Sequence, residues 1–166
     1  IEFTVEAGKF TGVADADGKF DGTVPEPSVI AGVQSTEPRA LETCARHMDT
    51  DRILHNLGKI MSFQNMNLHG DLIAGLPYES YERFGESFNT LYSLRMHQLQ
   101  LGFLKLLSGA PLNQIKEEHG YLFSTNPPYE IIGNRYLSSR ELMQLKEIED
   151  VLERYYNSGR FLTCLP

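Results

Sequence analysis

The sequence has few cysteines and no long apolar run, and these absences exclude several classes of protein. Its only cysteines are Cys44 and Cys164, which lie so far apart that neither a zinc framework nor a secreted disulfide scaffold is expected. No apolar stretch approaches the ~20 residues that a membrane-spanning helix needs. The sequence also has no initiating methionine, signal peptide or export motif. We therefore expect a cytoplasmic fragment of a longer protein, without a membrane partner.

Basic residues are also scarce relative to acidic ones. The sequence has 15 Lys and Arg against 22 Asp and Glu, a net charge of -7. Proteins that bind nucleic acid gather Lys and Arg on one face to contact phosphates. We therefore expect no nucleic-acid partner.

The residues that are present indicate an ordinary globular domain in which strands alternate with helices. The chain has 166 residues, of which 41% are hydrophobic, and this is enough for one domain with a real core. Alternating β-branched and apolar patterns predict strands, and apolar residues at helical spacing predict helices. The expected strands are 1–6, 29–34, 67–74 and 98–107, and the expected helices are 36–47, one capped by Thr50, and one that starts at Ser80.

This order of elements predicts the fold class α/β, with parallel strands. Because a complete (β/α) barrel needs eight units and typically ~250 residues, we expect a partial barrel of about four strands. We assign residues 1–107 to this half barrel and residues 108–166 to a C-terminal extension.

Residues 8–28 interrupt the pattern, since they are rich in Gly, Asp and Pro where a helix should join two parallel strands. They predict an irregular insertion or a small hairpin. The spacing of Asp15, Asp17 and Asp21 faintly resembles a calcium loop, but Lys19 occupies an alternate ligand position and no bidentate Glu follows. We interpret the segment as a solvated acidic turn and predict no metal site.

The C-terminal extension has a loop, an edge strand and a long helix as its expected elements. A short helix over 112–119 precedes residues 121–137, which Pro127 and Pro128 interrupt. Ser138 with Glu141 forms a capping box, and an amphipathic helix follows that ends near Gly159.

A half barrel has two open sheet edges, and unpaired edges are templates for pairing with another chain. We expect residues 8–28 and 121–137 to cover these edges. If they do not, self-association of the chain would satisfy them.

The strand around Asp71 raises the question of function, because a buried strand should be a continuous apolar run and DLIA begins with a carboxylate. Either Asp71 has a structural partner or it faces a ligand. Ligands of parallel α/β sheets bind beyond the carboxyl ends of the strands. The polar residues expected there are Glu6, Gln34, Asp71, Gln100 and Lys105, with Arg46 on the helix that follows the second strand.

Taken singly, each of these residues has a structural interpretation, such as a surface arginine or a capping carboxylate. Together they suit a small zwitterion with hydroxyl groups, since a guanidinium binds a carboxylate while carboxylates and amides bind ammonium and hydroxyl groups. We therefore expect Glu6, Gln34, Arg46 and Asp71 to cluster at the carboxyl edge of the sheet.

Two stretches resemble a known family. GVQSTEPRALETCARHMD (32–49) and DLIAGLPYES (71–80) are similar to the second half of the radical S-adenosylmethionine (SAM) barrel, as found in coproporphyrinogen-oxidase-like enzymes and in cobalamin-binding radical enzymes. The resemblance implies that Gln34, Arg46 and Asp71 contact SAM, and that Glu6 of TVEAG matches the acidic residue at the end of a barrel strand.

The tail, from HQLQLGFLKLLSGAPL to ERYYNSGRF, resembles more specifically the subgroup with an amino-terminal cobalamin domain. Some members of that subgroup carry the name magnesium-protoporphyrin monomethyl ester cyclase. The resemblance implies a parent oxidoreductase or transferase that uses SAM, a [4Fe-4S] cluster and, in this subgroup, cobalamin.

The sequence departs from this family in lacking the cluster motif C-x3-C-x2-C, which belongs to the first strand-loop unit of the barrel. We therefore expect this chain alone to bind no cluster and to be inactive. The alternative function is a non-catalytic α/β binding or assembly module. A reading frame that encodes the motif upstream would favour the enzyme, whereas one that matches these residues alone would favour the module. No catalytic residue and no substrate is predicted from the sequence.

Overall fold

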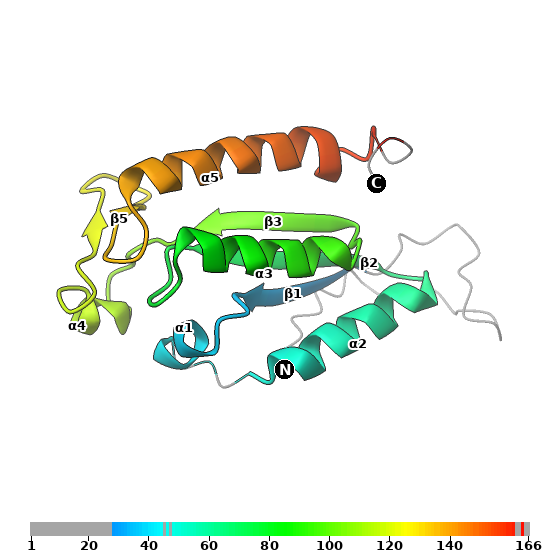
Figure 1. Cartoon of the computed structure of the whole chain (residues 1–166), viewed down its shortest axis with the longest axis horizontal. Coiled ribbons are helices and arrows are strands. Elements are labelled where there is room, and N and C mark those ends of the chain that lie inside the picture. The colour runs from blue at the N-terminus through cyan, green and yellow to red at the C-terminus, as the bar shows by residue number, and fades with distance from the viewer. Residues whose placement is uncertain (1–27, 45, 47, 162–163, 165–166) are drawn as a thin grey trace.

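The computed structural model describes residues 28–44, 46, 48–161 and 164. The expected first strand, Glu6 and almost all of the 8–28 segment lie outside these residues. Within them, the main element is a parallel sheet of three strands, β1 (Ser28–Gln34), β2 (Asn67–Ala74) and β3 (Gln98–Phe103), in the order β1-β2-β3 (Figure 1).

Helices form the connections between these strands, as parallel pairing requires. Helices α1 (Pro38–Thr43) and α2 (Thr50–Phe63) join β1 to β2, and α3 (Tyr81–Ser93) joins β2 to β3. The fold is therefore mixed α/β with parallel strands, as predicted, and it is consistent with part of a β/α barrel.

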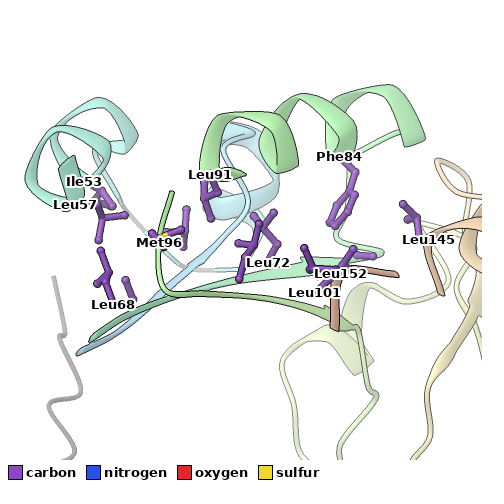
Figure 2. Close-up of a cluster of buried hydrophobic side chains, with 14 of the residues drawn as sticks. Ile53, Leu57, Leu68, Leu72, Phe84, Leu91, Met96, Leu101, Leu145 and Leu152 are labelled. Atoms are coloured by element: carbon purple, nitrogen blue, oxygen red, sulfur yellow. The ribbon is translucent and has the colours of Figure 1, made fainter. Parts of the chain in front are cut away.

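The hydrophobic core lies between one face of the sheet and the helices α2 and α3, and Leu145 of the last helix and Leu152 after it extend it (Figure 2). Buried and partly exposed residues alternate along β1 and β2, because successive side chains of a strand point to opposite faces. Each large aliphatic side chain buried here contributes roughly 1.5–3 kcal/mol. The helices supply Ile53, Leu57, Phe84 and Leu91, and the strands supply Leu68, Leu72, Leu99 and Leu101.

Two of the predicted helix starts differ from the structure. Asp49, and not Thr50, is the N-cap of α2, and its side chain accepts from the backbone N–H of Arg52. Helix α1 is shorter than the expected 36–47, since Glu37 is its N-cap and Pro38 its first residue. Arg46 therefore lies beyond the helix and not on it.

The C-terminal residues form a small unit of their own before the last helix. Helix α4 (Leu112–Ile115) is followed by β4 (Leu122–Phe123) and β5 (Ile131–Gly133), which pair antiparallel. Helix α5 (Ser139–Val151) begins with the predicted capping box of Ser138 and Glu141, and it continues as the π-helical turn η1 (Leu152–Asn157).

Parts of this C-terminal region cover the outer edge of β3. Beyond the strand, the N–H of Leu106 donates to the carbonyl of Tyr129 at 3.0 Å, and the N–H of Ile131 donates to that of Leu104 at 2.9 Å. At the start of β3, the amide of Asn157 accepts from the N–H of Leu99 and donates to its carbonyl, both at 3.0 Å. The expected cover by residues 121–137 is thus present near Leu104.

Among the described helices, none combines the length and the apolar character required to cross a membrane.

Candidate functional site

The face of the sheet opposite the helices carries a row of three residues, two of which have polar side chains. Gly32 of β1, Asp71 of β2 and Gln100 of β3 are partners in the strand register, so they lie side by side across the sheet. They occupy the strand positions that alternate with the buried core residues. The carboxylate of Asp71 thus has a residue without a side chain on one side and a primary amide on the other.

A pocket of about 340 Å³ adjoins this row towards the carboxyl ends of the strands. Its volume lies at the lower end of the range for small-molecule sites. Four of its residues were predicted from the sequence as polar strand-end positions. The residues that line it are Gln34, Asp71, Leu72, Ile73, Gln100, Gly102, Phe103, Leu104 and Lys105.

Gln34 is held in an unusual backbone conformation at the end of β1. Its φ is +60°, and the N–H of Ser35 donates to the carbonyl of Val33 at 2.8 Å, which closes a three-residue turn around Gln34. A turn of this kind at positive φ is rare and strained for a residue with a side chain. The side-chain oxygen Oε1 of Gln34 is buried and has no hydrogen-bond partner among the described residues, so it is an unused acceptor beside the pocket.

Arg46 lies next to the same part of β1. Its Nη1 donates to the carbonyl of Gly32 at 3.4 Å, and it forms no ion pair with the described residues. A Cβ at Gly32 would lie 2.8 Å from Nε2 of Gln34 and 4.0 Å from Nη1 of Arg46. The missing side chain of Gly32 therefore leaves the space that Gln34 and Arg46 use.

Asp71 has the electrostatic character of a carboxyl that is partly removed from water. Burial raises its pKa above the usual value, and the nearby His69 opposes the shift. His69 precedes Asp71 by two residues on the same strand and so lies on the same face. Because no described group donates a hydrogen bond to this carboxyl, the structural partner that would explain a carboxylate in this strand is absent from the described residues.

A buried carboxyl that the sequence did not reveal lies just behind the turn at Gln34. Glu79, in the loop after β2, is 0% exposed. Its Oε1 accepts from Ser35 Oγ at 2.5 Å and from Ser87 Oγ at 3.2 Å, whereas its Oε2 is buried without a partner. Burial raises the pKa of Glu79 to about 7, and the hydrogen bonds from the two serines oppose this shift.

The C-terminal region closes over the end of β2. The carbonyl of Gly75 accepts from Tyr121 Oη at 2.8 Å and from Asn134 Nδ2 at 3.0 Å. Behind them, the buried His119 contacts the hydroxyl of Tyr136 through Nδ1 at 3.0 Å. Gly75 has a φ of +100°, a conformation that favours glycine. These contacts fix the loop that carries Glu79.

The structure thus brings together most of the residues predicted for the site. Gln34 and Asp71 line one pocket, together with Gln100 and Lys105, and Arg46 lies beside Gly32 at its β1 side. Glu6 falls outside the described residues. Among those residues, no group of three or more His, Cys, Asp or Glu could hold a metal ion.

Glu79, with Ser35 and Ser87, was missed by the sequence analysis. A glutamate directly before a helix N-cap resembles an ordinary solvated residue, and no periodicity distinguishes it. The one signal in the sequence was the presence of serines at 35 and 87, whose hydroxyl groups can donate to a carboxylate.

The three parallel strands and their crossover helices are consistent with part of a β/α barrel, with the polar residues at its carboxyl edge. Among solved structures, the chain is similar to coproporphyrinogen III oxidase (HemN) from Escherichia coli, a radical SAM enzyme. The TM-score is 0.52 and the identity 17%, over 76% of this chain and 26% of that enzyme. The likeness shows a shared fold, and the chain spans about a quarter of that enzyme's length.

Two other comparisons concern the sequence. Residues 117–166 match the model of a family described as a protein of unknown function, DUF4080. This is the region that supplies Tyr121 and Asn134 to the end of β2 and Asn157 to the edge of β3. No curated protein matches the chain.

Proposed function

We propose that this chain is the C-terminal portion of a radical SAM iron-sulfur enzyme, and that the pocket beside Asp71 receives part of SAM and of the substrate. The observation that carries the proposal is a set of polar groups at the carboxyl edge of the sheet that lack a side-chain partner among the described residues. These are Oε1 of Gln34, the carboxyl of Asp71 and the guanidinium of Arg46, which bonds only the backbone carbonyl of Gly32. The radical SAM-like fold supports it.

Each group suits one part of the proposed ligand. The Arg46 guanidinium presents planar donors for a carboxylate. Oε1 of Gln34 can accept from an ammonium or hydroxyl group, and the carboxylate of Asp71 can accept from the hydroxyls of a ribose. Binding would satisfy Oε1 of Gln34, a buried acceptor that has no partner among the described residues. In the same proposal, Glu6 adds a further carboxylate, and Gln100 and Lys105 line the part of the pocket left to the substrate.

The iron-sulfur cluster belongs to another part of the proposed enzyme. The chain has two cysteines, and the relatives that it resembles bind their [4Fe-4S] cluster through a three-cysteine motif. When bound, that cluster supplies the electron for reductive cleavage of SAM. The residues of this chain would bind and orient SAM and shield it from water. The likeness of the tail to the cobalamin-binding subgroup makes cobalamin a further proposed cofactor of the parent.

The proposal includes an organisation of the chain. In it, residues 1–107 belong to the second half of the barrel and residues 108–166 to a C-terminal extension, whose described part closes over the end of β2 and the edge of β3. Among the described residues β1 has a strand partner on one side only, and in this proposal its other edge faces the remainder of the barrel, or a second copy of this chain when the remainder is missing.

Equilibrium dialysis with radiolabelled SAM tests the proposal. We expect saturable binding by the 166-residue chain, and at least a tenfold loss of affinity in Asp71→Asn and in Gln34→Ala, since each removes a buried polar contact worth about 1.5 kcal/mol or more. Gln114→Ala, in the short helix α4 and outside the pocket lining, is the matched control.

The alternative, a non-catalytic binding or assembly module, gives a different result. It predicts no saturable binding of SAM, and no difference between Asp71→Asn and the control. That result would refute the proposed function.

A further inference from the structure

We propose that Glu79 is a positioning residue that fixes the side chain of Gln34 in the pocket, and that this hold strengthens when Glu79 loses its proton. The effect on ligand affinity rests on the proposed function. The effect on Gln34 does not, because it follows from contacts within the chain.

Glu79 is joined to the turn after β1 by two serine hydroxyls. Ser35 Oγ and Ser87 Oγ both donate to its Oε1, at 2.5 Å and 3.2 Å. Ser35 follows Gln34 directly, and Ser87 lies on α3. Glu79 and both serines are 0% exposed, so water does not compete for these bonds.

Each serine hydroxyl also accepts a hydrogen bond from the backbone of the segment that follows Gln34. The N–H of Glu37 donates to Ser35 Oγ at 2.9 Å, and the N–H of Thr36 donates to Ser87 Oγ at 3.1 Å. The hydroxyl of Thr36 also contacts Ser87 Oγ at 2.8 Å. The carboxyl of Glu79 therefore organises residues 35–37, which follow the turn around Gln34.

The turn requires such support because Gln34 adopts a φ of +60°. Strained residues persist only where the surroundings over-determine them. Within the described residues, Glu79 is the one ionisable group bonded to Ser35. Without it, relaxation of the turn would move the Oε1 of Gln34 away from the pocket.

Protonation changes the strength of these bonds. Both serine donors use Oε1, and Oε2 is buried without a partner among the described residues, so Oε2 is the place for the proton. Burial raises the pKa of Glu79 to about 7. Hydrogen bonds to an ionised carboxylate are shorter and stronger than those to a neutral acid. The hold on residues 35–37 therefore tightens as the pH rises through about 7.

Other charged and titratable groups face Glu79 from each element around it. Glu37, before α1, and Arg83, on α3, form an ion pair at 2.9 Å. Burial raises the pKa of Cys44, after α1, and that of Tyr121, in the C-terminal region. Both therefore stay neutral between about pH 6 and about pH 8. The imidazole of His119 packs against Tyr78 and Tyr121 in the same region, so the comparison with Glu79→Gln is what isolates the contribution of Glu79.

Nuclear magnetic resonance tests the positioning role without any ligand. In the wild-type chain, we expect the side-chain amide resonances of Gln34 to shift with pH, with the same midpoint as the carboxyl carbon of Glu79. Glu79→Gln keeps an acceptor but cannot ionise, so the shift should disappear. Asp71→Asn is the control for the other carboxyl in the pocket and should retain the shift.

The ligand measurement compares SAM affinity at about pH 6 and about pH 8. For each protein we compare the ratio of its SAM affinity at about pH 8 to that at about pH 6. We expect this ratio to be severalfold larger in the wild-type chain than in Glu79→Gln. Titration of SAM itself affects both proteins equally and so does not contribute to the difference. Ser35→Ala should lose affinity at both values. Ser93→Ala, whose hydroxyl bonds a carbonyl of its own helix on the exposed side of α3, should resemble the wild type.

The outcomes separate this inference from the proposed function. If Gln34 titrates identically in the wild type and in Glu79→Gln, the positioning role is wrong, whether or not SAM binds. If Gln34 follows Glu79 but SAM does not bind at either pH, the positioning role stands and the proposed function fails. Should Glu79→Gln not fold, different midpoints for Glu79 and Gln34 in the wild type would overturn the inference.

Discussion

The hydroxyl of Ser35 donates a 2.5 Å hydrogen bond to the buried carboxyl of Glu79, 44 residues further along the chain. This bond joins the turn that ends β1 to the loop that follows β2. The two strands are neighbours in the sheet, so this bond connects their carboxyl ends on the side of the helices. Gln34 and Asp71, from the same two strands, line the pocket. Glu79 therefore links the stability of the fold to the geometry of the site.

The stability of the chain should fall as the pH rises from about 4.5 to about 7. The pKa of Glu79 is raised from 4.5 to about 7 in the folded chain, so folding favours its protonated form. This contribution is fully present below the unfolded pKa and is lost as the pH rises through the folded pKa. Its size is on the order of 3 kcal/mol. Urea unfolding at several pH values should show this decline in the wild type and a smaller one in Glu79→Gln. Parallel pH dependences in the two proteins would contradict it.

Asn157→Ala should destabilise the chain by about 1–2 kcal/mol. The Asn157 amide pairs with both backbone groups of Leu99, and its loss leaves them without these partners at the edge of β3. Asn89→Ala, at an exposed position on α3, is the matched control and should change the free energy of unfolding by less than about 0.5 kcal/mol. Equal effects of the two substitutions in urea unfolding would show that Asn157 does not protect the edge.

Gly32→Ala should weaken ligand binding with little loss of stability. The new Cβ would lie 2.8 Å from Nε2 of Gln34, at the end of a flexible side chain that can move away. Gly58→Ala, in α2, meets nothing within 4 Å and should stabilise the chain by up to about 1 kcal/mol. Dialysis with SAM and thermal unfolding of both variants check this. Unchanged SAM affinity in Gly32→Ala would mean that the position of Gln34 does not matter for binding.

Reconstitution of this chain with iron and sulfide should give no stable cluster. The two cysteines, Cys44 and Cys164, provide fewer thiolates than the three that the family motif supplies, and burial raises the pKa of the Cys44 thiol, which disfavours the thiolate. With SAM and a strong reductant, no 5'-deoxyadenosine should form. Absorption spectroscopy and chromatography of the products measure the two outcomes, and a stable cluster with turnover would refute the expectation.

The sequence predicted those parts of the fold that depend on periodicity and local capping. The apolar stripe of Ile53 and Leu57, that of Phe84 and Leu91, and the capping box at Ser138 were sufficient to find α2, α3 and the start of α5. The parallel arrangement followed from the alternation of strands and helices. These features depend on residues close together in the chain.

Features that depend on tertiary contacts were not predictable. The first helix was expected to begin at residue 36, but the hydroxyl of Thr36 contacts Ser87 and Glu37 caps α1 instead. The positive φ of Gln34 and the burial of Glu79 were not foreseen for the same reason. Both involve contacts between the turn after β1 and the loop after β2, which are far apart in the sequence. Gln34, Asp71, Gln100 and Lys105 were predicted as candidates from their positions in the strands, and the structure places all four in the lining of one pocket.

The most direct test of the proposed site is a chemical-shift titration of the labelled chain with SAM. We expect the largest changes on the backbone amides of Gly32 and Asp71 and on the side-chain amides of Gln34 and Gln100, which adjoin one pocket. Asp71→Asn should shift the whole titration to higher SAM concentration. Changes confined to other parts of the chain, or none at saturating SAM, would contradict it.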